Sequence, residues 1–220
     1  LIVIWIFIRL EETLPKARRI PMSRAGFFDG FKEVVSNVPT LCYMICMGLF
    51  FGSFIGYLNS SQQIFQDLFH TGDLFSLYFG VLAIVFGASS LVNSQLVQKL
   101  GMQHLAKLAI WGIIASSAIF LIVHLSVTIE LWMFMIYAAV LFFCFGLVFG
   151  NVNAMAMEPM GHVAGIAAAI IGSTSSLMSM VIGTFIGQMY NGTLFPVTCG
   201  FLIFGSISML IFSYAQRYQQ

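Results

Sequence analysis

The sequence predicts an all-α membrane protein with six transmembrane helices. Of its 220 residues, 60% are hydrophobic and only 8% are charged, whereas a soluble domain is usually about a quarter charged. The chain contains six mainly apolar stretches that reach the roughly 20 residues needed to cross a bilayer. These stretches are continuously apolar and do not alternate with polar residues, so helices are expected rather than the strands of a β-barrel.

The six spans are expected at about residues 40–63, 74–97, 105–125, 131–155, 163–189 and 196–215. The opening run, residues 1–8, is apolar but too short to span. Basic residues follow this run, which is the reverse of their order in a signal peptide. We expect residues 1–39 to be the end of a preceding transmembrane helix plus a central cytoplasmic loop, and residues 40–220 to form the six-helix bundle. The chain is then a fragment of a longer protein.

The charged residues are distributed unequally between the two sides of the predicted bundle. If the segments outside the membrane are numbered alternately, every basic residue falls in the first, third or seventh. The opposite side has Asp67, Asp73 and Glu130 and no Lys or Arg. By the positive-inside rule, the N- and C-terminal segments are expected to be cytoplasmic. The basic residues are Arg9, Lys16, Arg18, Arg19, Arg24, Lys32, Lys99, Lys107 and Arg217.

Small residues recur at steps of three and four in the second and fifth spans. At 3.6 residues per turn, each series forms a continuous stripe on one side of its helix. Such stripes let helix backbones approach closely inside lipid, where burial of apolar surface gains nothing. The glycines expected to pack against other helices are Gly80, Gly87, Gly165, Gly172, Gly183 and Gly187.

The first span has a different pattern, with Gly48, Gly52 and Gly56 on one side and polar and aromatic residues nearly half a turn away. The mixed face suits a water-accessible cavity that holds an amphiphilic ligand. Alternatively, its hydroxyls bond back to their own helix and its rings face lipid. The fourth span carries a weaker, mostly apolar version of this face. The candidate binding residues on the two faces are Cys46, Phe50, Ser53, Tyr57, Ser61, Tyr137, Leu141 and Cys144.

The order of the spans suggests an internal repeat of three helices. The first and fourth spans each pair a candidate cavity face with glycines, the second and fifth carry the small stripes, and the third and sixth are plain apolar helices. Because three is odd, the second unit would enter the membrane from the opposite side. Inverted repeats of this kind are typical of secondary transporters.

Nothing in the sequence predicts a catalytic or metal site. Glu158 and His162 are four residues apart, but Pro159 disfavours helical geometry for the glutamate, and no further ligand lies nearby in the sequence. The cysteines are best interpreted as small apolar side chains in helices. An enzyme is therefore not expected. The segment around Glu158 is instead predicted to be a helix junction or cytoplasmic gate, formed by Asn151, Asn153, Glu158 and Gly161.

Three stretches of the sequence resemble the major facilitator superfamily. "RLEETLPKARR" resembles the start of its central cytoplasmic loop, and "NSQLVQKLGMQHLAK" resembles its short loop between the eighth and ninth helices, with Gly101 at the turn. "GNVNAMAMEPMGHVAGIAAAIIGS" is similar to the junction of the tenth and eleventh helices in the Bcr/CflA-type multidrug efflux proteins.

This resemblance implies that the chain is the C-terminal half of a twelve-helix transporter, whose N-terminal six-helix half is missing. It further implies drug–proton antiport in a bacterial inner membrane, with small lipophilic drugs or antibiotics as substrates, the proton gradient as energy source and no cofactor. In the family, the first helix of each unit lines the central cavity and the second packs between the halves. The spans themselves hold no mid-membrane carboxylate that could couple protons.

Other functions on the same scaffold stay open. Sugars or other metabolites could be the exported substrates, although the uncharged cavity face favours hydrophobic cargo. A channel would show a polar pore ring or filter loop, whereas the polar residues here cluster mainly in one span. The half-protein could also be inactive alone, because alternating access needs two halves that move against each other.

Overall fold

The computed structural model describes residues 5, 8, 9 and 24–218 and shows α-helices, π- and 3₁₀-turns and no strand among them. The predicted end of a preceding helix falls mostly outside the described residues, as do Lys16, Arg18 and Arg19. The elements are α2 (Arg24–Ser36), α3 (Val38–Gln63), η2 (Ile64–Leu68), η3 (Gly72–Leu74), α4 (Phe75–Leu100), α5 (Met102–Ser126), α6 (Leu131–Met157), η4 (Glu158–Val163), α7 (Ala164–Gln188) and α8 (Phe195–Arg217).

All six predicted spans coincide with long helices, α3 to α8. Within the described residues, five continuous helical stretches are long and apolar enough to cross a membrane. One of these, Leu131–Gln188, contains both α6 and α7, joined by the turn η4. The membrane-spanning, all-helical fold class is therefore confirmed.

The ends of the helices follow from local sequence signals. Asn37 accepts a 3.0 Å hydrogen bond from the backbone N–H of Thr40, and Pro39 occupies the first turn, so α3 begins with a capped N-terminus. Gly101 has φ +76° between α4 and α5, a conformation that side chains rarely adopt. The tight turn predicted at Gly101 is confirmed.

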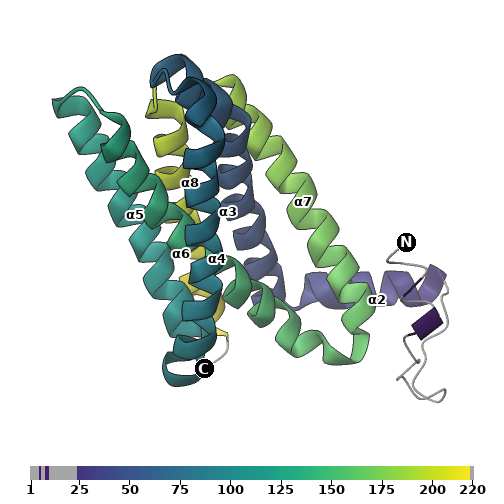
Figure 1. Cartoon of the computed structure of the whole chain (residues 1–220). Helices are drawn as coiled ribbons and strands as arrows, with labels where there is room; N and C mark the ends of the chain where they lie inside the picture. The colour runs from purple at the N-terminus through teal and green to yellow at the C-terminus, as the bar shows by residue number, and fades with distance from the viewer. Residues whose placement is uncertain (1–4, 6–7, 10–23, 219–220) are drawn as a thin grey trace.

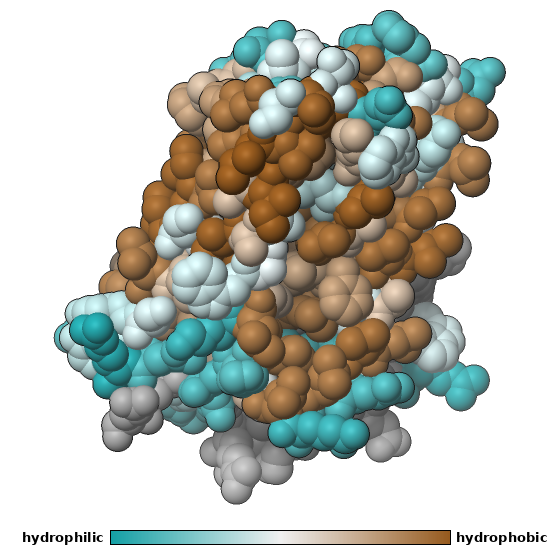
Figure 2. All heavy atoms as spheres, turned by 90° about the vertical axis from the view of Figure 1, so that its left-hand side faces the viewer, coloured by the Kyte–Doolittle hydropathy of each residue, from teal (hydrophilic) through white to brown (hydrophobic). Residues whose placement is uncertain are grey.

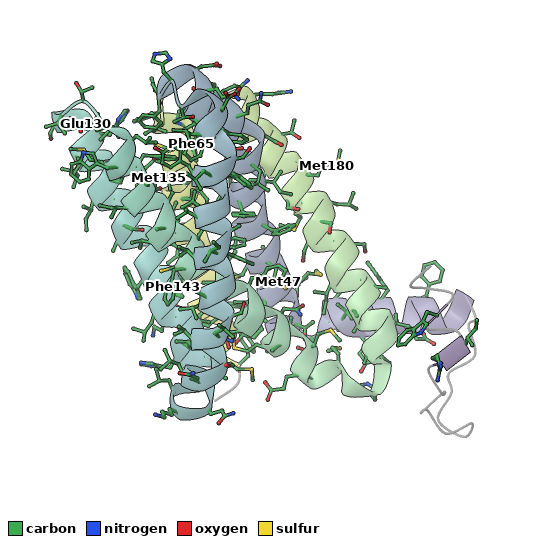
Figure 3. The ribbon with its side chains drawn as sticks, in the orientation of Figure 1. Met47, Phe65, Glu130, Met135, Phe143 and Met180 are labelled. Atoms are coloured by element: carbon green, nitrogen blue, oxygen red, sulfur yellow. The ribbon has the colours of Figure 1, made fainter. Side chains whose placement is uncertain are left out.

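The helices alternate in direction through the bundle (Figure 1). The start of α3, the α4–α5 turn and the end of α8 lie at one end. Glu130, which precedes α6, lies at the opposite end (Figure 3). Lys99, Lys107 and Arg217 therefore share the end at which α2 crosses the bundle. This arrangement agrees with the separation of charges on which the expected orientation rests.

Helix α3 lies at the centre and packs against α6, α7 and α8. Its glycine stripe faces α7. A Cβ atom added at Gly52 would lie 2.7 Å from Cβ of Ile182, and one added at Gly56 would lie 2.6 Å from Cβ of Ile186. The backbone of α3 therefore approaches α7 more closely than any side chain on that stripe would allow.

One face of the bundle carries an apolar belt. Figure 2 shows hydrophobic side chains across the middle of one face and hydrophilic ones concentrated towards its ends. Trp111, Ile119 and Ile122 of α5 are 53%, 63% and 65% exposed. A water-facing protein rarely exposes so large an apolar surface, so the belt fits contact with lipid.

The junction between α6 and α7 corrects one expectation. Pro159 was expected to move Glu158 out of helical geometry, but Glu158 keeps right-handed helical angles, with φ −53° and ψ −49°. The helix breaks later, at Met160 (φ −101°, ψ 15°) and at Val163 (φ −121°, ψ 27°). The preference against α geometry before proline is only a bias, and the helical hydrogen bond from the Glu158 N–H to the Ala154 carbonyl is kept.

Candidate substrate-binding surface

Aromatic side chains from three helices meet between α3, α4 and α6. Phe54 stacks on Phe145 with ring centroids 4.6 Å apart, and its ring lies 6.3 Å from that of Phe86. Phe51 stacks on Phe149 at 5.5 Å. Phe145 is buried, whereas the other four rings are half-buried. We call Phe51, Phe54, Phe86, Phe145 and Phe149 the aromatic surface.

The aromatic surface continues inward to Tyr57. The Tyr57 ring meets Phe142 edge to face at 5.4 Å, and Phe142 meets Phe54 in the same way at 5.1 Å. Tyr57 is only 2% exposed, and its hydroxyl has no hydrogen-bond partner within the described residues. An unmade hydrogen bond of a buried hydroxyl costs about 1–3 kcal/mol. A bound molecule with an acceptor atom could remove this cost.

The predicted binding residues of α3 lie in helix contacts rather than on an open surface. The thiol of Cys46 donates to the carbonyl of Ser208 at 3.5 Å, and the hydroxyl of Ser53 donates to that of Leu49 at 3.1 Å. Leu49 belongs to α3 itself and Ser208 to α8. Hydroxyls that bond back to their own helix are the alternative that the sequence left open. All five predicted binding residues of α3 are buried, namely Cys46, Phe50, Ser53, Tyr57 and Ser61.

The predicted binding residues of α6, Tyr137, Leu141 and Cys144, are also buried. The Tyr137 ring stacks on Phe120 of α5 at 4.1 Å, and its hydroxyl lies 3.1 Å from that of Ser117. Tyr137 therefore connects α6 to α5, and Cys144 lies beside Gly112 of α5. Of the eight predicted binding residues, Tyr57 is the one whose ring lies beside a ring of the aromatic surface, that of Phe54 at 6.3 Å. The binding roles of all eight stay predictions.

The sequence interpretation missed the aromatic surface. Its signal was present, because Phe51 and Phe54 are three residues apart, and Phe142, Phe145 and Phe149 follow steps of three and four. Residues at such steps share one side of a helix. Aromatic rings are common throughout this chain, so their spacing alone did not distinguish a shared surface from lipid-facing rings.

The predicted packing glycines divide into two groups. An added Cβ at Gly183 would lie 2.7 Å from Cβ of Ile55, and one at Gly187 would lie 3.0 Å from Cβ of Asn59, so both glycines face α3. The other four are open, since no atom of the described part of the chain lies within 4 Å of an added Cβ. The open glycines are Gly80, Gly87, Gly165 and Gly172.

The four predicted junction residues lie in different surroundings. The side-chain amide of Asn151 donates to Oδ1 of Asn93 at 2.6 Å, which joins α6 to α4. Asn153 and Gly161 are exposed. Glu158 lines an open cavity of about 450 Å³ together with His104 and Lys107, which follow the α4–α5 turn.

His162 and Glu33 provide the ion pair found among the described residues. The Nε2 atom of His162 contacts Oε1 of Glu33, so η4 is linked to α2. Glu158, the carboxylate four residues before His162, is not its partner in this contact. No group of three or more His, Cys, Asp or Glu within the described residues is placed to hold a metal ion.

Comparisons with known proteins connect this arrangement to transport. The family model of the Major Facilitator Superfamily matches residues 1–184. The uncharacterized MFS-type transporter YdgK of Bacillus subtilis is 23% identical over 194 residues, which are 85% of this chain and 46% of the relative. A protein named bicyclomycin resistance protein homolog, from Haemophilus influenzae, is 23% identical over 193 residues, which are 87% of this chain and 48% of the relative.

The chain spans about half the length of these curated relatives. No solved structure matches it significantly. The family match covers well over half of the chain, and the six long apolar helices agree with it. The chain therefore belongs to the Major Facilitator Superfamily, whose members are membrane transporters and not enzymes.

Proposed function

We propose that this chain forms the C-terminal half of a proton-coupled exporter of small lipophilic compounds, which works by alternating access in a bacterial inner membrane. The observation that carries the proposal is the aromatic surface on α3, α4 and α6, with the unpartnered Tyr57 hydroxyl behind it. Rings of this kind bind apolar and planar molecules by stacking and by contact with their edges.

The chemistry of the surface favours uncharged or weakly polar cargo. The helices α3 to α8 contain no Asp or Glu. The ring of Phe54 has the rings of Phe86, Phe142 and Phe145 as neighbours. A sugar would need several polar side chains on the same surface. Of the described residues that have a buried, unpartnered polar atom, Tyr57 is the one whose ring contacts the aromatic surface. The name of the Haemophilus relative, a homolog of a bicyclomycin resistance protein, supports an antibiotic as cargo.

The second part of the proposal is a partner half. Gly80 and Gly87 of α4 and Gly165 and Gly172 of α7 leave open backbone on two helices that hold corresponding places in the two three-helix units, α3–α5 and α6–α8. Open small residues inside lipid suit close packing against further helices. We assign this role to an N-terminal six-helix half, which would move against this one during alternating access.

Proton coupling is then assigned to the N-terminal half. A coupling group must be titratable and reachable within the membrane. Asp67, Asp73, Glu130 and Glu158 all lie at or beyond the ends of the spanning helices. Both termini are expected to be cytoplasmic, from the positions of Lys99, Lys107 and Arg217. In the proposed antiport, protons that flow into the cell would drive cargo out of it.

The test uses the full-length protein in proteoliposomes with an imposed pH gradient and a fluorescent lipophilic compound as cargo. Phe54→Ala removes the ring that stacks on Phe145 and is expected to lower kcat/KM about tenfold, because ring pairs contribute up to about 1.5 kcal/mol beyond burial. Ile119→Ala, on the lipid-facing side of α5, is the matched control and is expected to keep normal transport. Equal transport by both variants would contradict the assignment of the aromatic surface.

A further inference from the structure

Helix α2 crosses the end of the bundle, transverse to α3 and α7 (Figure 1). One side of it is fixed to the bundle. An added Cβ at Gly30 would lie 2.7 Å from Cγ2 of Ile166 in α7, Val34 is fully buried, and Glu33 pairs with His162 of η4. The position of α2 is thus set by three neighbouring contacts and not only by the chain connection to α3.

A second side of α2 is apolar and exposed. Phe28, Phe31 and Val35 are 68%, 45% and 39% exposed. Their spacing of three and four residues puts them on one side of the helix, within about 60° by the roughly 100° step. We call these three residues the outer face of α2.

A third side of α2 is polar. Asp29, Lys32 and Ser36 are exposed, and the helical step places them between the outer face and Glu33. Helix α2 therefore has three sides in sequence around its axis. One contacts the bundle, the next is the apolar outer face, and the third is polar. A helix with this division, lying across the end of membrane-spanning helices, has the properties of an interfacial helix.

We propose that α2 lies in the lipid–water interface of the cytoplasmic leaflet, with its outer face against the acyl chains and its polar side in water. The occupant of the outer face is the bilayer itself. The proposal depends on the membrane-spanning fold and on the end of the bundle at which α2 lies, and not on the identity of the cargo.

Charge complementarity selects anionic lipid as the partner. The sequence from position 13 to position 24 contains Lys16, Arg18, Arg19 and Arg24 and no acidic residue, and Lys32 is exposed on α2 itself. Basic segments next to a membrane are attracted by anionic headgroups. A second copy of the chain is a poorer occupant, because three side chains cannot supply the roughly 800 Å² per partner of a stable interface.

The contact between Glu33 and His162 links the proposed position of α2 to the joint between α6 and α7. His162 belongs to η4, the turn that joins α6 to α7. Any displacement of α2 from the interface therefore acts on the joint between these two helices. Anionic lipid is expected to hold the joint in place through the contacts of α2 with α7 and η4.

The experiment measures the depth of nitroxide spin labels in the full-length protein. Labels attached in Phe31→Cys and Val35→Cys are compared with labels in Asp29→Cys and Ser36→Cys, which are matched controls on the polar side of the same helix. In vesicles of phosphatidylcholine and phosphatidylglycerol, we expect the first two labels to collide more with oxygen than with a water-soluble nickel chelate, and the controls to show the reverse. Equal access of the chelate to all four labels would overturn the proposal.

Two further measurements show what shields the labels of the outer face from the nickel chelate. In vesicles of phosphatidylcholine alone, the labels of the outer face are expected to move towards water, and Lys32→Gln is expected to produce part of the same shift in the mixed vesicles. Depths that do not change with lipid charge would contradict the role of anionic headgroups. Spin–spin broadening that disappears on dilution with unlabelled protein would identify a second copy as the occupant and would also overturn the proposal.

Discussion

The side-chain amide of Asn151 donates a 2.6 Å hydrogen bond to Oδ1 of Asn93 and thereby ties α6 to α4. The same nitrogen donates to the carbonyl of Leu147 at 2.7 Å, so both of its N–H groups can be satisfied. Asn151 is only 2% exposed. Helix α4 has two buried residues, Leu82 and Ser89, so the asparagine pair adds a polar contact to a helix with little buried surface.

Removal of the asparagine pair is expected to weaken the α4–α6 contact by a small, measurable amount. In a double-mutant cycle of Asn151→Ala and Asn93→Ala, we expect a coupling free energy of about 0.6 kcal/mol, and at most about 1.7 kcal/mol, which is typical of hydrogen bonds between helices in membranes. The measurement is reversible unfolding of the full-length protein in mixed micelles. Asn153→Ala, at an exposed position, serves as the control. A coupling of zero would show that the bond adds nothing to the contact.

The two groups of glycines on α7 are expected to respond differently to a larger side chain. Gly183→Val places atoms against Ile55 of α3 and should destabilise the bundle by about 1–3 kcal/mol, the usual cost of overpacking. Gly172→Val meets no atom of the described residues within 4 Å and should leave the stability of the six-helix bundle within about 0.5 kcal/mol of the original.

Transport in the full-length protein provides the second readout for these glycines. If a partner half covers α7, Gly172→Val should lower the transport rate although the bundle stays folded. Normal transport by this variant would contradict the proposed interface. Normal stability of Gly183→Val would contradict the close α3–α7 contact instead, so the two outcomes test different parts of the structure.

The buried hydroxyl of Tyr57 gives a prediction in which stability and function move in opposite directions. Its oxygen has no partner within the described residues, so Tyr57→Phe should keep or slightly raise the thermal stability of the protein, because an unmade hydrogen bond disappears. If cargo accepts a hydrogen bond there, the same variant should raise KM about tenfold for a cargo with an acceptor atom, since such a bond contributes about 1.5 kcal/mol at most. An analogue without the acceptor should show no change, and an equal effect on both compounds would exclude the bond.

Two adjacent positions of α3 test which side of the helix meets the cargo. Phe54 is half-buried in the aromatic surface, whereas Ser53 is 1% exposed and donates to Leu49 within α3. In a background with Cys199 replaced by Ser, the thiol of Phe54→Cys should react with a membrane-permeant maleimide and be protected by cargo. The thiol of Ser53→Cys should react slowly with or without cargo. Protection confined to Ser53→Cys would restore the binding face first inferred from the sequence.

Much of the fold followed from the sequence because the bilayer imposes a length and an apolar composition on every span. Helix α5 ends at Ser126 and helix α6 begins at Leu131, each within a few residues of the expected boundary. The turn at Gly101 followed from the family resemblance of its loop, and the positive φ found there favours glycine. The orientation and the two inverted units stay predictions.

The candidate site was less accessible from the sequence. The helical step showed that Cys46 and Ser53 share a side of α3, but not that α8 covers it. It showed that Gly172 and Gly183 share a stripe on α7, but not that only the second has a neighbour within the described residues. Which of several equally apolar sides meets another helix depends on the shapes of both partners.

The sequence by itself determined the membrane environment, the number and order of the spans and the membership of a transporter family, because these depend on composition, length and local motifs. The tertiary structure decided that Phe51 and Phe54 meet Phe145 and Phe149, and that Phe31 and Val35 of α2 stay exposed. Inside lipid, apolar burial does not distinguish one side of a helix from another, so close packing and a few hydrogen bonds select the neighbours.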